Sequence, residues 1–137
     1  PFAGAYCASK AAVHALSDAL RMELAPFAIE VMEVQPGAIA SSFGASASQQ
    51  AEALIREDSP WWPLREGIRA RARASQDNPT PASDFATHLF AAVQRDKRPR
   101  LLRLGNGSRA LPLLAALLPR ALLQRLLSKR FGLAKAL

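Results

Sequence analysis

Tyr6 and Lys10 are the residues of this sequence whose types and spacing are best suited to acid–base chemistry. They stand four positions apart, so a helix would bring both side chains to the same face. An ammonium group close to a phenol favours the phenolate, which allows a tyrosine to act as a general acid or base. The Tyr-x-x-x-Lys spacing alone is weak, because ordinary helix surfaces also produce it. Its meaning therefore depends on the elements around it.

The elements that follow the pair predict a helix, a strand and a turn in that order. The pattern favours a helix from about Ala5 to Ala25, ended by Pro26. The apolar run at residues 29–34 is typical of a parallel strand covered on both faces, and Pro-Gly at 36–37 ends it. Ligands of open α/β sheets bind beyond the carboxyl ends of strands, so we expect a site at residues 36–42. A plain strand-to-loop turn is the alternative.

This order of elements, with Pro36-Gly37-Ala38-Ile39-Ala40-Ser41 after the strand, resembles the short-chain dehydrogenase/reductase family. Ser41 stands where the family has Thr, so a hydroxyl is kept and a methyl is lost. The stretches 9–20 and 35–39 are most similar to the subset of 1-acyldihydroxyacetone-phosphate reductases and retinoid or steroid dehydrogenases. The resemblance implies an α/β fold, namely the C-terminal half of a Rossmann-type doubly wound parallel sheet with a helical C-terminal extension.

The resemblance also implies an activity: an NAD(P)-dependent oxidoreductase that interconverts a carbonyl and an alcohol, on a lipophilic substrate and with NADP favoured over NAD. Tyr6 would exchange the proton with the substrate oxygen, and Lys10 would bind the nicotinamide ribose. Ser loses the branched side chain that orients Thr, so its contact to the cofactor is less firmly held. The cofactor contacts implied are Tyr6, Lys10, Pro36, Gly37, Ile39 and Ser41.

The chain begins with Pro1, and its resemblance starts at the Tyr helix, so we expect a fragment of a longer protein. The glycine-rich dinucleotide turn, the Asn that supports the proton relay and the Ser that binds the substrate oxygen would then lie upstream. We expect the fragment alone to be inactive. The alternative is a non-catalytic partial fold or an interaction module, because two strands leave a sheet edge open to another chain.

Residues 43–62 correspond to the variable region that closes over substrate in the family, and Phe43, Trp61 and Trp62 would supply an apolar wall. Aromatic residues beside prolines also anchor loops, and we favour that role for the two tryptophans. A helix is expected next over residues 64–76, with a solvated row of Arg65, Arg69 and Arg73. A phosphate site on this row is the second alternative.

Two further elements are predicted before the tail. Thr80 should cap a helix that begins at Pro81, with Phe85, Leu89 and Val93 pointing inward. Residues 100–104 should form the last strand, which Gly105-Asn106-Gly107 closes.

The first helix carries two stripes of interest. One is apolar and should face a core, and the other consists of small residues and would admit a neighbouring helix, either within the subunit or in a homo-oligomer. The apolar stripe is Val13, Leu16, Leu20 and Leu24, and the small stripe is Ala8, Ala11, Ala15 and Ala19.

The basic charge of the chain belongs to its tail. Residues 95–137 hold eleven Lys or Arg and one acid, whereas residues 1–94 have a net charge of −3, for a total of +7. We divide the chain into the dehydrogenase half, 1–105, and a basic amphipathic helical tail, 106–137. The tail either folds back over substrate or a partner subunit, or lies on an anionic membrane. Nucleic acid is disfavoured because no interleaved aromatics accompany its cations.

The remaining residues point to no further chemistry. Cys7 is the single cysteine, which fits a reducing compartment, and we expect a cytoplasmic protein, peripheral to a membrane if the tail binds one. His14 and His88 are isolated, so no metal is expected. No apolar run is long enough to span a bilayer.

Overall fold

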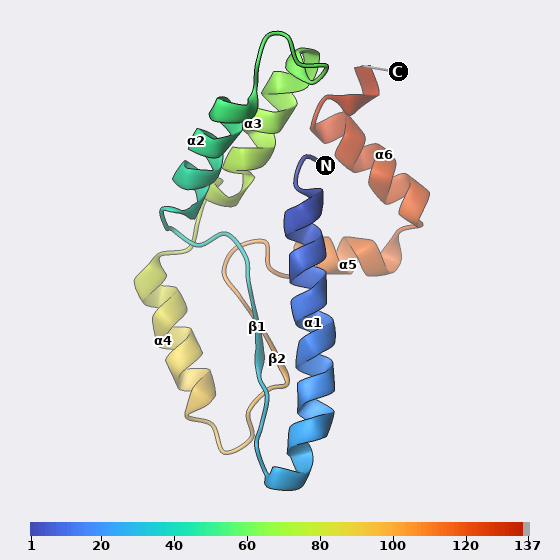
Figure 1. Cartoon of the computed structure of the whole chain (residues 1–137). Helices are drawn as coiled ribbons and strands as arrows, with labels where there is room; N and C mark the ends of the chain where they lie inside the picture. Colours follow the sequence, from blue (N-terminus) through green and yellow to red (C-terminus); the bar gives the residue numbers. More distant parts are fainter. Residues whose placement is uncertain (136–137) are drawn as a thin grey trace.

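The computed structural model describes residues 1–135, and over this range helices surround a short parallel sheet (Figure 1). The strands are β1 (Glu33–Pro36) and β2 (Leu101–Leu104). The helices are α1 (Gly4–Leu24), α2 (Phe43–Leu54), α3 (Arg65–Arg73), α4 (Ala82–Val93), α5 (Ala110–Leu117) and α6 (Arg120–Arg130). Single 3₁₀ turns lie at Ala25–Phe27, Trp62–Leu64, Ala74–Gln76 and Leu133–Lys135.

The two strands pair in parallel, from Glu33 opposite Leu101 to Pro36 opposite Leu104. A parallel pair needs a long crossover connection, and α2, α3 and α4 all lie within it. The fold is therefore mixed α/β and matches part of a Rossmann-type sheet, as the sequence predicts. The first strand is shorter than expected: Ile29 precedes it and is 51% exposed. The pairing of β1 with β2 begins at Glu33, so among the described residues the apolar run before it has no partner strand.

Helix α1 follows the sequence prediction closely in its bounds but not in its burial. Its α-helical hydrogen bonding ends at Leu24, and a 3₁₀ turn carrying Pro26 follows. Leu20 and Leu24 are half-buried, whereas Val13 and Leu16 are 48% and 59% exposed. The expectation that the whole stripe faces a core is wrong for these two residues, because no described element covers that part of the helix.

The start of α4 also differs from the prediction. Pro81 precedes the first helical residue, and Thr80 instead joins the loop after β1 through a bridge to Ile39. The Thr80 hydroxyl accepts a hydrogen bond from the Asn106 backbone N–H at 2.9 Å, so it is committed outside the helix. At the other end of α4, Val93 is exposed rather than inward-facing.

The tail consists of α5 and α6, and the end of α6 contacts α3. Gly67 of α3 makes this contact close, because a Cβ there would come within 2.1 Å of the Phe131 carbonyl oxygen. Phe131 is 6% exposed and is one of the few buried apolar side chains. Over residues 1–135 no helix combines the length and apolar character needed to cross a bilayer.

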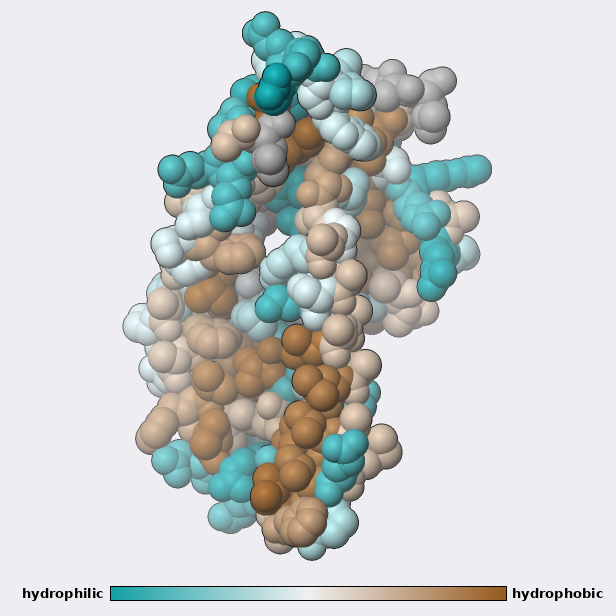
Figure 2. Space-filling view, viewed as in Figure 1, coloured by the Kyte–Doolittle hydropathy of each residue, from teal (hydrophilic) through white to brown (hydrophobic). Residues whose placement is uncertain are grey.

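The buried core is small for a chain of this length. Ala92 and Phe131 are the buried hydrophobic residues of the described part, and the accessible surface of the chain is 10135 Å². A compact monomer of 14.8 kDa would expose roughly 7,000 Å². Figure 2 shows hydrophobic residues gathered over the second half of α1 and the neighbouring strands. Apolar area that a compact domain would bury is therefore left uncovered.

Candidate active site

Tyr6 and Lys10 lie in the first two turns of α1, as their spacing predicts. The Lys10 Nζ atom is 5.5 Å from the centroid of the Tyr6 ring. Tyr6 is 45% exposed, and the ring of Phe43, at the start of α2, lies beside it with centroids 5.8 Å apart. An ammonium and a phenol thus share one accessible face of the helix, where both can reach a bound molecule.

The loop after β1 is held by backbone hydrogen bonds on two sides. The Gly37 N–H donates to the Leu104 carbonyl at 2.7 Å, and the Ala38 N–H donates to the Asn106 carbonyl at 2.8 Å. On the other side, the Ala40 N–H donates to the Thr80 carbonyl and the Thr80 N–H to the Ala38 carbonyl, both at 2.9 Å. The sheet edge therefore positions the loop that carries Ile39 and Ser41.

Two glycines allow these backbones to approach. At Gly37 a Cβ would come within 2.2 Å of the Asn106 carbonyl oxygen. Gly105 has φ +86°, and a Cβ there would meet the Ile39 side chain at 2.5 Å. The Ile39 side chain consequently packs over Gly105. Pro36, the last residue of β1, is exposed.

Ser41 lies just before α2 and is exposed. Its Oγ accepts a hydrogen bond from the Phe43 N–H at 3.4 Å, a long contact that leaves the hydroxyl hydrogen free to donate elsewhere. The chemistry of the donors on Tyr6, Lys10 and Ser41 fits the hydroxyls and amide of a nicotinamide nucleoside, which requires such groups. That Tyr6, Lys10 and Ser41 contact the cofactor stays a prediction.

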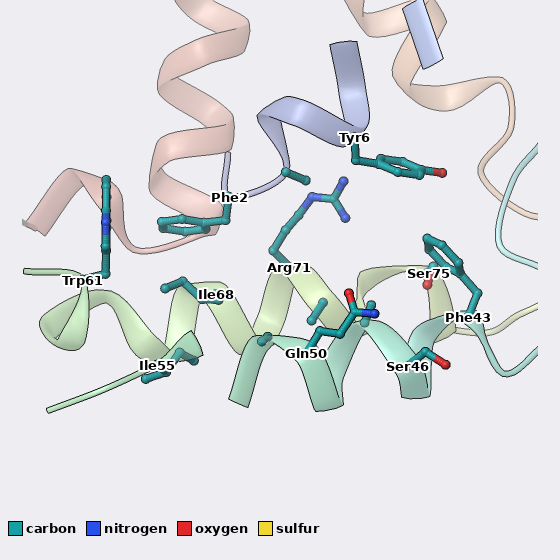
Figure 3. Close-up of a pocket in the computed structure, with 14 residues that line it drawn as sticks. Phe2, Tyr6, Phe43, Ser46, Gln50, Ile55, Trp61, Ile68, Arg71 and Ser75 are labelled. Carbon is teal, nitrogen blue, oxygen red and sulfur yellow. The ribbon is translucent and has the colours of Figure 1, made fainter. Parts of the chain in front are cut away.

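An open apolar cavity of about 660 Å³ lies between the start of α1 and the pair α2 and α3 (Figure 3). Aromatic rings mark two of its regions: Phe2 meets Trp61 edge-to-face at 6.3 Å, and Tyr6 meets Phe43. Its fourteen lining residues are Phe2, Ala3, Tyr6, Phe43, Ser46, Ala47, Gln50, Ala51, Ile55, Trp61, Ile68, Arg71, Ala72 and Ser75.

The cavity separates the predicted site residues into two groups. Tyr6, Phe43 and Trp61 line it. Trp62 does not line it; its ring instead packs against the Arg65 guanidinium, with 4.6 Å between that group and the ring centroid. The other predicted residues, which lie outside the lining, are Lys10, Pro36, Gly37, Ile39 and Ser41.

Sequence reasoning missed Arg71, which lines the cavity from α3. The arginines noted in the sequence occupy the row of Arg65, Arg69 and Arg73, whereas Arg71 lies off that row on the opposite side of the helix. The sequence signal that could have singled out Arg71 is its position between two small apolar residues, Ala70 and Ala72.

The cavity walls are joined by an ion pair between α2 and α3. Arg69 donates to both carboxylate oxygens of Glu52, at 2.6 and 2.9 Å, and to Glu66 at 2.6 Å. The hydrogen bond from Arg69 lowers the pKa of Glu52 below its ordinary value, and the two carboxylates raise the pKa of Arg69. Within residues 1–135 no cluster of His, Cys, Asp and Glu side chains has the composition of a metal site.

Comparison with known proteins identifies the family of this chain. The profile of the short chain dehydrogenase family matches residues 1–52, which include α1, β1 and the loop to Ser41. A short-chain dehydrogenase/reductase of Pestalotiopsis microspora is 29% identical over 131 residues, covering 94% of this chain and 49% of that protein. The chain belongs to the short-chain dehydrogenase/reductase family.

Two other members of this family align with nearly the whole length of the chain. A short-chain dehydrogenase of Pyricularia oryzae is 30% identical over 132 residues, covering 96% of this chain and 46% of its own length. The NADPH-dependent 1-acyldihydroxyacetone phosphate reductase of Saccharomyces cerevisiae is 27% identical over 136 residues, or 98% of this chain and 44% of that enzyme. The chain thus spans about half the length of these relatives. No solved structure gives a significant match.

Proposed function

We propose that the protein containing these residues is an NAD(P)-dependent oxidoreductase that interconverts a carbonyl and an alcohol. One observation carries the proposal: Tyr6 lines an apolar cavity while the Lys10 ammonium lies 5.5 Å from its ring. The phenol is therefore accessible to a substrate in the cavity, and the cation stands beside it. Family membership supports the same class of reaction.

Tyr6 exchanges the proton in this mechanism. A bound nicotinamide supplies or accepts the hydride. In reduction the Tyr6 hydroxyl donates its proton to the substrate oxygen, and in oxidation the phenolate takes the proton back. The Lys10 ammonium, beside the Tyr6 ring, donates to ribose hydroxyls, while the exposed Ser41 hydroxyl binds cofactor oxygens. Pro36, Gly37 and Ile39 shape the nicotinamide side of the site.

The substrate in this proposal is lipophilic. Apart from Arg71, the cavity is lined by uncharged side chains, with Phe43 and Trp61 among its aromatic walls. A wall of this kind favours a ligand that buries apolar area. The name of one relative, the NADPH-dependent 1-acyldihydroxyacetone phosphate reductase of Saccharomyces cerevisiae, supports a lipid-derived ketone and NADP as the cofactor.

We further propose that the 137 residues alone do not catalyse this reaction. Over residues 1–135 the sheet has two strands, and much of the apolar surface of α1 is uncovered. A sheet with open edges and so little buried area does not rigidly position a dinucleotide. The small-residue face of α1, in the same proposal, serves helix packing within the whole protein or between its subunits.

The test is Tyr6→Phe in the full-length protein, which removes the phenol oxygen and leaves the ring against Phe43. We expect ketone reduction to fall by roughly 10²- to 10⁴-fold, the usual range for losing a general acid. Phe2→Leu, at another aromatic wall of the same cavity, serves as the matched control and should retain a measurable kcat. A Tyr6→Phe protein that reduces the ketone at the full rate would contradict the assignment.

The basic tail supports a second candidate function, peripheral binding to an anionic membrane from the cytoplasm. The apolar side chains of α6 and of the residue that follows it divide into two sets. Leu123 and Leu127 are half-buried and Phe131 is buried, whereas Leu122 and Leu126 are 43% and 49% exposed. On the helical wheel Lys129 lies next to this exposed pair on one side and Arg130 on the other. Exposed leucines bordered by cations suit the headgroup region of an anionic bilayer.

Cosedimentation with vesicles tests this second function. Wild-type protein should pellet with vesicles that contain phosphatidylserine and remain in solution with pure phosphatidylcholine vesicles. The double substitution Leu122→Gln and Leu126→Gln should abolish pelleting, while Arg56→Gln, an exposed arginine outside the tail, should not change it. Equal pelleting of the double variant and the wild type would exclude the tail as the membrane contact.

A further inference from the structure

Arg71 is the one charged residue among the fourteen that line the cavity beside Tyr6. It extends from α3 and is half-buried. Figure 3 shows its side chain directed toward the start of α1, between the region of Phe2 and Trp61 and the region of Tyr6 and Phe43. A guanidinium group thus stands in an otherwise uncharged cavity.

Two other arginines of this helix, Arg65 and Arg69, are engaged, and Arg71 is not. Arg69 is bound to Glu52 and Glu66. Arg65 donates to the Trp62 carbonyl at 3.0 Å and packs against the Trp62 ring. Within residues 1–135, Arg71 makes no hydrogen bond and no ion pair with another side chain or backbone group.

A free guanidinium at such a place has a defined chemical preference. Arginine presents five N–H donors in a planar fork that fits the two oxygens of a phosphate or carboxylate. Partial burial among apolar side chains withdraws water from these donors, so an oxyanion that replaces that water is bound more strongly than at an open surface. The cavity holds no carboxylate to compete for the group.

We propose that Arg71 anchors an oxyanion of the substrate, and that the substrate is therefore a long-chain carbonyl compound with a phosphate or carboxylate group. This inference rests on the proposed function for the position of the reacting carbonyl near Tyr6. The apolar chain lies along the walls that include Ile55, Ile68 and Trp61, while the oxyanion meets Arg71. Arg71 selects the substrate and takes no part in the proton transfer.

Binding to the full-length protein tests the anchor without any reaction. Calorimetric titration would compare oleoyl lysophosphatidate, oleate and monooleoylglycerol, which share one chain and differ in the anionic group. We expect Arg71→Gln to weaken lysophosphatidate binding about ten- to a hundredfold, the range for a lost charged hydrogen bond, and to leave monooleoylglycerol unchanged. Arg71→Lys should restore part of the affinity, and Arg73→Gln, an exposed arginine on the same helix, should match the wild type.

The same variants separate this inference from the proposed function. Oleate shows which oxyanion is preferred: if it also loses affinity in Arg71→Gln, a carboxylate suffices, and if only lysophosphatidate does, a phosphate is required. A wild-type protein that binds in this charge-dependent way and reduces no ketone would overturn the function and leave the anchor intact. Unchanged lysophosphatidate affinity in a folded Arg71→Gln protein would overturn the anchor, whether or not Tyr6-dependent reduction is present.

Discussion

Glu52 and Arg69 join α2 to α3 through two parallel hydrogen bonds, from Nε to Oε1 at 2.6 Å and from Nη2 to Oε2 at 2.9 Å. This bidentate geometry is the strongest form of an arginine–carboxylate pair. It holds together the two helices that form much of the cavity wall, and their orientation sets the positions of Phe43 and Arg71. The pair is therefore a structural support for the candidate site.

We expect stability to depend on the ionisation of Glu52. Its pKa lies below the ordinary value because Arg69 donates to the carboxylate, so the stabilisation is fully present above about pH 4.5 and is lost as the pH falls through the lowered value. Glu52→Gln should remove this acid-dependent component of the free energy of unfolding. Urea unfolding followed by circular dichroism, above and below that range, measures it.

The side chains of Glu52 and Arg69 are both solvent-accessible, so the contribution of their ion pair to stability should be small and sensitive to salt. In about 1 M NaCl, where the screening length is about 3 Å, wild type and Glu52→Gln should converge. Glu57→Gln, an exposed glutamate after α2, is the control and should follow the wild-type pH curve. A Glu52→Gln curve identical to wild type at low salt would show that the pair contributes nothing.

Gly37→Ala should destabilise the loop that presents Ile39 and Ser41. The new methyl would lie 2.2 Å from the Asn106 carbonyl oxygen and 2.8 Å from the Ser108 nitrogen, both backbone atoms, so the loop or β2 must shift. We expect a loss of about 1–3 kcal/mol in the free energy of unfolding, with weaker cofactor binding in the full-length protein. Gly4→Ala meets nothing within 4 Å and should be neutral or slightly stabilising.

Gly67→Ala should loosen the tail. A methyl at this position would lie 2.1 Å from the Phe131 carbonyl oxygen. To relieve this clash, the end of α6 must move away from α3. Limited trypsin digestion should then cleave within Arg120–Arg130 faster than in wild type, while cleavage near Arg56 stays the same. Equal rates in both regions would show that this contact does not hold the tail.

Ser41→Ala tests the proposed cofactor contact with little structural disturbance. The hydrogen bond that Ser41 accepts from Phe43 is 3.4 Å long, so its loss should barely change stability. We expect the KM for the nicotinamide cofactor to rise severalfold, while Ser41→Thr keeps the hydroxyl and the wild-type KM. Ser42→Ala is the neighbouring control, and an effect of equal size there would remove the special role of Ser41.

Local sequence patterns predicted the elements whose signals lie within a few residues. The interval between Tyr6 and Lys10 and the stop at Pro26 follow from helix geometry and the missing N–H of proline. The order of the Tyr helix, the strand and Pro36-Gly37 was specific enough to predict the family. Interactions between residues close in the sequence are sufficient to determine these elements.

Contacts between segments that are distant in the sequence could not be predicted from local sequence patterns. Thr80 has the residue type of a helix cap, yet its hydroxyl accepts from the Asn106 N–H, twenty-six positions away. The extent of β1 depended on where β2 lies, and the apolar stripe of α1 is buried only where another segment meets it.

By itself the sequence determined the spacing of Tyr6 and Lys10 and the family, because both depend on near neighbours along the chain. Only the tertiary structure brought Arg71 from α3 into the same cavity as Tyr6 from α1, sixty-five positions earlier. It also showed that the neighbouring Arg69 is occupied by Glu52 and Glu66. Which arginine remains free to bind a ligand depends on long-range packing, and residue type alone does not encode it.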